Sequence, residues 1–141
     1  MAESMVTGKA MNELLEYLIR HLSFLYNEQG ARFVNSETHG ADALVELELK
    51  DIRLRLVRDR GQLFLDFQSV ASSSLEWFSV DVVYQLVKKH PGDQSELDDR
   101  YVKFVHHHLA EISAAFSPAN WESTERHLHQ YERERAKRMF G

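Results

Sequence analysis

The stretch from residue 45 to residue 67, VELELKDIRLRLVRDRGQLFLDF, alternates apolar and charged side chains almost without a break. A period of two is typical of β-strands that have one apolar and one polar face. Two-residue turns at Lys50-Asp51 and at Arg60-Gly61 each keep the same face apolar. Because a slip of one residue would turn a whole strand over, this agreement predicts the register of three strands. The side chains expected to face one core are those of residues 45, 47, 49, 52, 54, 56, 63, 65 and 67.

The opposite face of these strands carries charged residues that stand across from one another. In the predicted register Glu48 lies opposite Arg53, and Arg55 lies between Glu46 and Asp66. Opposite charges at such positions form cross-strand pairs that contribute about 0.2–1 kcal/mol each. The arginine-rich row is therefore most simply a ladder of ion pairs on a solvated face.

Four residues near the second turn have no place in that ladder. Val57 is expected opposite Phe64, while Arg58 and Arg60 have no assigned acid except the neighbouring Asp59. We expect the four to share the outer face, where an apolar pair beside unpaired arginines would suit a protein partner. Val57, Arg58, Arg60 and Phe64 are therefore the predicted partner-binding residues.

Apolar spacing on either side of this stretch predicts the remaining elements. Residues 9–28 repeat apolar side chains at helical spacing and stop before Gly30. Further strands are expected at residues 31–37 and 74–78. The C-terminal helices are expected to begin at three serine caps, which are Ser79, Ser95 with Asp98, and Ser117 before Pro118.

These elements predict an α+β protein: an antiparallel β-meander of about four strands, with an N-terminal helix and three C-terminal helices packed on one face. A chain of 141 residues has the usual length of one domain, so we expect a single domain over residues 1–141. No stretch reaches the ~20 apolar residues that span a bilayer, and no signal-peptide pattern begins the chain. With no cysteine either, we expect a cytoplasmic protein that does not bind membranes.

Charge narrows the class of partner. The net charge is −5, divided between an acidic body and a basic tail that begins at residue 126. A nucleic-acid-binding domain is normally net basic, so no nucleic acid is expected. An acidic body suits a basic protein partner because complementary charge speeds encounter, although the same charge also keeps a protein soluble. Asp93, Glu96 and Asp99 form an alternative acidic site, since helix capping explains much but not all of that cluster.

Eight histidines, with three in succession at His106–His108, invite a metal interpretation. Consecutive helical residues point about 100° apart, so the run cannot converge on one ion. The pairs spaced by four, His107 with Glu111 and Glu125 with His129, supply only two ligands each. We therefore expect no metal and no cofactor.

His108 is the histidine that lies on the apolar stripe of its helix. A histidine at such a position is most often a hydrogen-bonded core residue, and the alternative is a catalytic or pH-sensitive role. The sequence contains neither GxSxG nor HExxH, and neither of the phosphate-binding loops GxGxxG and Walker A. An enzyme or small-ligand-binding domain with a sheet/helix pocket near His108 is the alternative function, because scattered site residues leave no motif.

The chain has a leading amphipathic helix, the meander LRLRLVRDRGQLFLDF, the strand-to-helix run EWFSVDVV and a terminal helix ending ERERAKRMFG. This layout resembles that of small bacterial immunity proteins of polymorphic toxin systems. The resemblance covers most of the chain and rests on layout, so no family residue is assigned to a position here. It implies a cytoplasmic, non-enzymatic protein that binds one toxin domain and blocks its active site. The predicted function is accordingly a protein-binding module for a partner such as a basic toxin domain, and a structural or regulatory homo-oligomer is the second alternative.

Overall fold

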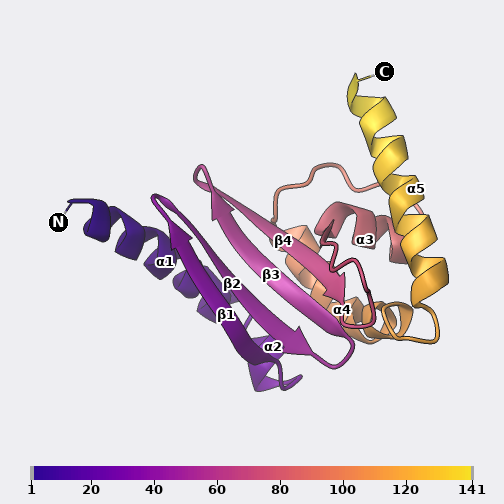
Figure 1. Ribbon diagram of the computed structural model, residues 1–141, viewed down its shortest axis with the longest axis horizontal. Helices are drawn as coiled ribbons and strands as arrows, with labels where there is room; N and C mark the ends of the chain where they lie inside the picture. Colours follow the sequence, from indigo (N-terminus) through magenta and orange to yellow (C-terminus); the bar gives the residue numbers. More distant parts are fainter. Residues whose placement is uncertain (1, 141) are drawn as a thin grey trace.

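The chain folds into a five-stranded antiparallel sheet with helices on one face, as a computed structural model that describes residues 2–140 shows (Figure 1). The helices are α1 (Ala2–His21), α2 (Phe24–Asn27), α3 (Val80–Lys88), α4 (Asp99–Ala115) and α5 (Trp121–Phe140). The strands are β1 (Arg32–His39), β2 (Asp42–Leu49), β3 (Ile52–Asp59), β4 (Gln62–Ser69) and β5 (Phe78–Ser79). The strands lie in the sheet in chain order. The predicted α+β class and antiparallel meander are confirmed, and the sheet has five strands where about four were predicted.

The register of β2, β3 and β4 is the one that the two turns predict. Leu54 pairs with Leu47 on one side and with Phe67 on the other. The turn at residues 60–61 has positive φ angles of 54° and 80°, the backbone that suits a two-residue hairpin. The predicted core side chains are all buried, except that of residue 63, which is half-buried.

The N-terminal helical segment differs from the prediction over residues 9–28. α1 begins at Ala2 and ends at His21, and the short α2 follows after a turn at Leu22 and Ser23. Leu22 and Leu25 are both fully buried. The turn and α2 therefore both contribute side chains to the core.

The strand predicted at residues 74–78 is also shorter than expected. Residues 70–77 form a loop, and only Phe78 and Ser79 pair with β4. Of the predicted caps, Ser79 precedes α3 as expected, but α4 is capped by Asp98, whose carboxylate accepts from the Tyr101 N–H at 3.1 Å. α5 begins at Trp121, after a turn that follows the expected serine cap.

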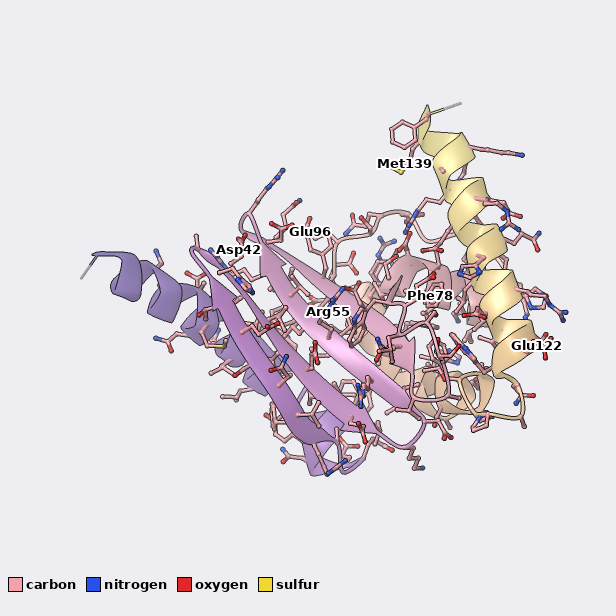
Figure 2. All side chains as sticks on the ribbon, in the orientation of Figure 1. Asp42, Arg55, Phe78, Glu96, Glu122 and Met139 are labelled. Atoms are coloured by element: carbon pink, nitrogen blue, oxygen red, sulfur yellow. The ribbon has the colours of Figure 1, made fainter. Side chains whose placement is uncertain are left out.

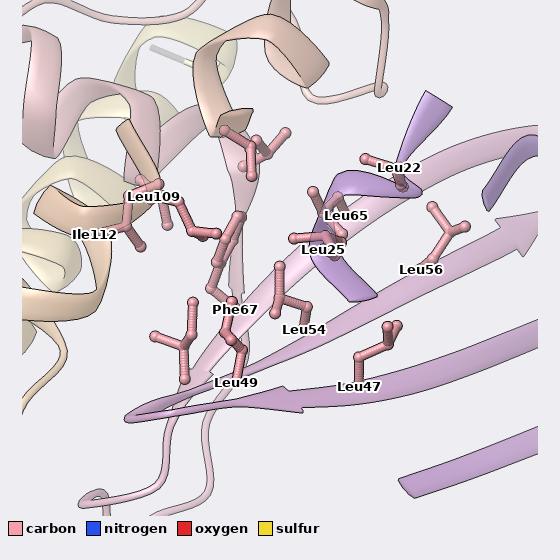
Figure 3. Close-up of a cluster of buried hydrophobic side chains, with 14 of the residues drawn as sticks. Leu22, Leu25, Leu47, Leu49, Leu54, Leu56, Leu65, Phe67, Leu109 and Ile112 are labelled. Carbon is pink, nitrogen blue, oxygen red and sulfur yellow. The ribbon is translucent and has the colours of Figure 1, made fainter. Parts of the chain in front are cut away.

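One hydrophobic cluster fills the space between the sheet and the helices (Figure 3). Leu22 and Leu25 reach it from the N-terminal helical segment, and Leu109 and Ile112 reach it from α4. Phe67 of β4 lies between the two groups and is fully buried. Burying one such side chain contributes about 1.5–3 kcal/mol, so this cluster dominates the stability of the fold.

The last helix, α5, packs on α3 beside the β5 edge (Figure 1). Asp81 in the first turn of α3 has a side chain only 9% exposed, and its Oδ2 lies 3.0 Å from Arg135 Nη1 on α5. The Ser79 hydroxyl also accepts from Arg135, at 2.8 Å. An ion pair therefore joins α3 and α5. Within residues 2–140, no helix combines the length and the apolar character needed to cross a bilayer.

Candidate functional site

The helices α1, α3 and α4 lie on one face of the sheet (Figure 1). The opposite face carries an apolar row. Leu44 of β2, Val57 of β3 and Phe64 of β4 stand side by side across it, and all three are half-buried. We call these three residues the outer row. The predicted pair of Val57 with Phe64 is confirmed, and Leu44 extends it by one strand. An apolar row within a solvated sheet face is the kind of patch that partner proteins cover.

Arg58 lies on the opposite face of the sheet, so the prediction that it joins Val57 and Phe64 is wrong. Its Nε lies 2.8 Å from Glu13 Oε2 on α1, and its Nη1 donates to the Ala41 carbonyl at 2.7 Å. Successive side chains of a strand point to opposite faces, so the residue after Val57 must point toward α1. Arg58 therefore joins β3 to α1.

Arg60 also lies outside the outer row. Its side chain is 92% exposed at the hairpin tip, where its Nε lies 4.0 Å from Asp59 Oδ1. An ion pair this exposed holds a guanidinium only weakly. Of the four predicted partner-binding residues, the structure therefore brings together Val57 and Phe64 only.

Carboxylates lie around the outer row. Glu37 of β1 stands directly opposite Leu44, and Glu46 is the next residue of β2 on the same face. Within residues 2–140 neither carboxylate has a basic side chain as an ion-pair partner, although Arg55 was predicted to pair with Glu46. Asp42, at the other end of β2, accepts a hydrogen bond from the Arg60 backbone N–H at the β3–β4 turn. No basic side chain of the described residues forms an ion pair with it. The rim of the outer row is therefore negatively charged.

The arginines on this face form ion pairs with other acidic residues. Arg32 and Arg53 both donate to Glu48, at 2.9 and 3.1 Å. Arg55 donates to Asp66 through two nitrogens, at 2.9 and 3.2 Å. The predicted pairs of Glu48 with Arg53 and of Arg55 with Asp66 are confirmed. These arginines belong to the ladder of ion pairs. The carboxylates of Glu37 and Glu46 therefore remain available to a partner protein.

The loop between β4 and β5 covers one end of the same face. Gln68, which is buried, donates to the Leu75 carbonyl at 2.6 Å, and the ring of Trp77 lies 4.5 Å from the Arg55 guanidinium carbon. Burial there raises the pKa of Asp66 above its ordinary value of 3.8, and the paired Arg55 opposes the rise. The open part of the face is thus the part that carries the outer row.

The alternative acidic residues do not form one site. Asp93 Oδ2 lies 2.6 Å from Arg100 Nη1, Glu96 accepts from the Gln62 amide at 3.3 Å, and Asp99 is exposed in the first turn of α4. Asp93 lines two hollows of about 270 and about 410 Å³. Each acid thus has a separate environment, and Asp93 has an exposed ion-pair partner in Arg100.

The three consecutive histidines have different neighbours. His106 stacks on Phe24 with ring centroids 4.2 Å apart, and His107 is exposed. His108 Nδ1 lies 2.8 Å from Glu111 Oε1, and its backbone leaves helical geometry (φ −117°, ψ 17°), which kinks α4. His108 is thus hydrogen-bonded, as predicted for a packed histidine, but its side chain is 25% exposed and lies at the edge of the core.

A second constellation joins residues that are far apart in the sequence. Ligand atoms of Glu76, in the loop before β5, and of His129 and Glu132 on α5 all lie within 4.8 Å of one another. His129 Nε2 lies 2.8 Å from Glu76 Oε2. Burial raises the pKa of Glu132 above its ordinary value of 4.5, and the charge of Glu76 raises it further. We call these three residues the Glu–His–Glu cluster.

Sequence reasoning missed this cluster because it considered pairs along one helix. The structure brings three metal-ligand residues together where the sequence showed only pairs, and the third member, Glu76, lies 53 residues before His129. The local signal was the spacing of His129 and Glu132, which places both on one face of a helix. Glu125, which the sequence places four residues before His129, does not belong to the cluster.

Comparisons with protein-family models, with curated proteins and with solved structures found no match to this chain. Any functional argument therefore rests on the outer row, its charged rim and the Glu–His–Glu cluster.

Proposed function

We propose that this protein is a non-enzymatic binding module of the cytoplasm that takes the basic face of a partner protein on the outer face of its sheet. An immunity protein that blocks a basic toxin domain would act in this way. The observation that carries the proposal is the outer row, Leu44, Val57 and Phe64, exposed in part between carboxylates. The alternative functions are a ligand pocket near His108 and a homo-oligomer.

The apolar part of the proposed surface supplies the affinity. Phe64 and its two neighbours form a continuous strip across three strands, and the strands are fixed by the core beneath them. A rigid strip loses little conformational entropy when it is covered, and an aromatic side chain at its end is a frequent hot spot. We therefore expect Phe64 to contribute most to binding.

The charged rim supplies the choice of partner. Glu37 and Glu46 flank Leu44, and neither is neutralised by a basic side chain of the described chain. A partner with lysines or arginines around an apolar centre would pair with these carboxylates, whereas an acidic partner would be repelled. The proposed occupant is therefore a protein with a net basic binding face.

The test begins by identifying the partner in the source cells. A photo-crosslinking amino acid at residue 57 marks proteins that touch the outer row, and the same group at Ser123 on α5 serves as the control position. The captured protein is then purified, and its affinity for the unmodified chain is measured by calorimetry. Phe64→Ala should weaken that affinity by more than ~1 kcal/mol while changing the melting temperature little. Arg53→Ala should change neither the affinity nor the melting temperature strongly.

Substitutions that reverse one charge test the rim separately. Glu46→Lys should weaken the complex and reduce its dependence on salt, while Glu122→Lys, the same change at an exposed site on α5 (Figure 2), should do neither. A partner with an acidic binding face would contradict the proposal. Capture of a second copy of this chain would favour the homo-oligomer. Unchanged affinity in Phe64→Ala would contradict the proposal that the outer row carries the binding.

A further inference from the structure

The Glu–His–Glu cluster has the chemistry of a metal site. It combines one imidazole nitrogen with two carboxylates, Glu76 and Glu132, and the three ligand atoms lie within 4.8 Å of one another. Around a Zn²⁺ ion with bonds of about 2.0–2.2 Å, neighbouring ligand atoms stand ~3–4 Å apart. Side-chain rotations of the two glutamates are sufficient to close that difference, since both are long and only half-buried.

The observed contacts leave one member of the cluster without a partner. His129 and Glu76 are hydrogen-bonded to each other, so both side chains have a partner. The half-buried carboxylate of Glu132 accepts no hydrogen bond and forms no ion pair of 4 Å or less with any described residue, although Arg135 is near enough to favour its charged form. A carboxylate placed beside a second carboxylate and an imidazole, with no bonded donor, is in the position of a metal ligand.

We propose that Glu76, His129 and Glu132 bind one divalent transition-metal ion, with Zn²⁺ as the preferred occupant. Imidazole nitrogen favours Zn²⁺ over Mg²⁺ and Ca²⁺, which select oxygen ligands only, and the order of affinities places Zn²⁺ above Mn²⁺ and Fe²⁺ at such a site. Two carboxylates and a neutral imidazole balance the charge of the ion. Three protein ligands leave at least one coordination position for water.

The surroundings of His129 suit that role. Its ring packs against Phe78 with centroids 5.5 Å apart, which limits its rotation. His129 also lines an open hollow of about 380 Å³ together with Arg126 and Arg133, so water can reach its ring. A bound ion would tie the loop between β4 and β5 to α5, two parts of the chain that are otherwise joined here by one hydrogen bond of His129.

The experiment uses the whole chain, purified without a histidine tag and freed of metal by chelation. Equilibrium dialysis against Zn²⁺ followed by elemental analysis should give one tightly held ion per chain, and calorimetry should give the affinity. Glu132→Gln, which preserves the size of the side chain, should weaken the affinity at least ~10-fold, because even residues that merely orient a ligand have effects of that size. His129→Gln should weaken it at least as much.

Two control variants distinguish this site from the other histidine sites of the chain. Glu125→Gln removes the carboxylate that lies four residues before His129, and His107→Ala disrupts the histidine run. Neither should change the affinity. Loss of Zn²⁺ in either control, or its retention in Glu132→Gln, would overturn the assignment.

A second measurement does not depend on the folding of any variant. Co²⁺ bound by an imidazole and two carboxylates should give visible absorption bands in the unmodified chain, and a stoichiometric amount of Zn²⁺ should abolish them. If the unmodified chain gives no bands and holds no ion after dialysis, the proposal is wrong. Because the cluster lies outside the outer row, this result is independent of the proposed protein partner.

Discussion

Arg58 on β3 lies 2.8 Å from Glu13 on α1, measured from the guanidinium Nε to the carboxylate Oε2. The Arg58 side chain is only 20% exposed, and it also donates to the Ala41 carbonyl at the first hairpin turn. One guanidinium thus joins the N-terminal helix, a central strand and a turn. The role of Arg58 is therefore structural.

Replacing Arg58 by Ala should lower the free energy of unfolding by ~1 kcal/mol, because the pair is partly exposed and its Glu13 partner can return to water. Chemical denaturation measures this loss. The double variant with Glu13→Ala should lose less than the sum of the two single changes. Affinity for a partner that touches Val57 should not change in Arg58→Ala, and a large loss of affinity there would return Arg58 to the binding surface.

The two faces of β3 should respond very differently to substitution. Leu54 is fully buried and lies between Leu47 and Phe67, so Leu54→Asp would place an unpaired charge in the core and should unfold the protein. Arg53, the preceding residue, points to solvent and shares Glu48 with another arginine. Arg53→Ala should therefore change the melting temperature little. A Leu54→Asp variant that melts within about two degrees of the parent would contradict the observed register.

The sheet could be predicted from the sequence because its determinants are local. Alternation between apolar and charged residues fixes which side chains share a face, and turns at residues 50–51 and 60–61 fix the pairing. Both constraints lie within the 23 residues of the segment 45–67. The same parity rule, applied strictly, also places Arg58 inward with Leu56. The expectation that Arg58 lies on the outer face rests on its nearness to the hairpin tip, and the parity of the strand overrides it.

The rest of the candidate site could not be predicted because its contacts are non-local. The acid partner of Arg58 is on α1, outside the meander, so no strand pattern could supply it. Glu76 approaches His129 only because residues 70–77 leave the sheet as a loop, where the sequence pattern indicated a strand. Tertiary packing decided both positions, and periodicity carries no information about it.

The ion pair between α3 and α5 should be important for stability. Removing Arg135 by Arg135→Ala leaves the buried carboxylate of Asp81 with its serine neighbour and no cation. We expect a loss of ~3 kcal/mol in the free energy of unfolding, at the low end for a broken buried pair because Arg135 is itself 29% exposed. Denaturant titration measures it, and Arg133→Ala, an exposed change on the same helix, is the control.

Removing both partners should be less harmful than removing the cation alone. In the double variant Asp81→Ala with Arg135→Ala, no charge remains buried at the junction of α3 and α5. Its stability should exceed that of Arg135→Ala. If the double variant is the less stable of the two, the contribution of Arg135 comes from the packing of its side chain rather than from the charge of Asp81.

The pH dependence of stability should reveal the burial of Asp66. Burial raises the pKa of this carboxyl above 3.8 in the folded protein, although Arg55 opposes the rise, so the folded state binds the proton more tightly than the unfolded chain does. The contribution of Asp66 to stability should therefore fall as the pH rises from below 3.8 through the folded pKa, and stay constant above it.

Asp66→Asn does not titrate, so it isolates this contribution. The free energy of unfolding of the parent minus that of the variant should decrease with rising pH in that acidic window and then level off. Denaturant titrations at several values between about pH 3 and pH 7 measure the difference, and a carbon NMR titration of the Asp66 carboxyl locates the folded pKa directly. A difference that increases with pH would mean that the two hydrogen bonds from Arg55 outweigh burial, and that the charged ladder stabilises the sheet more than its position suggests.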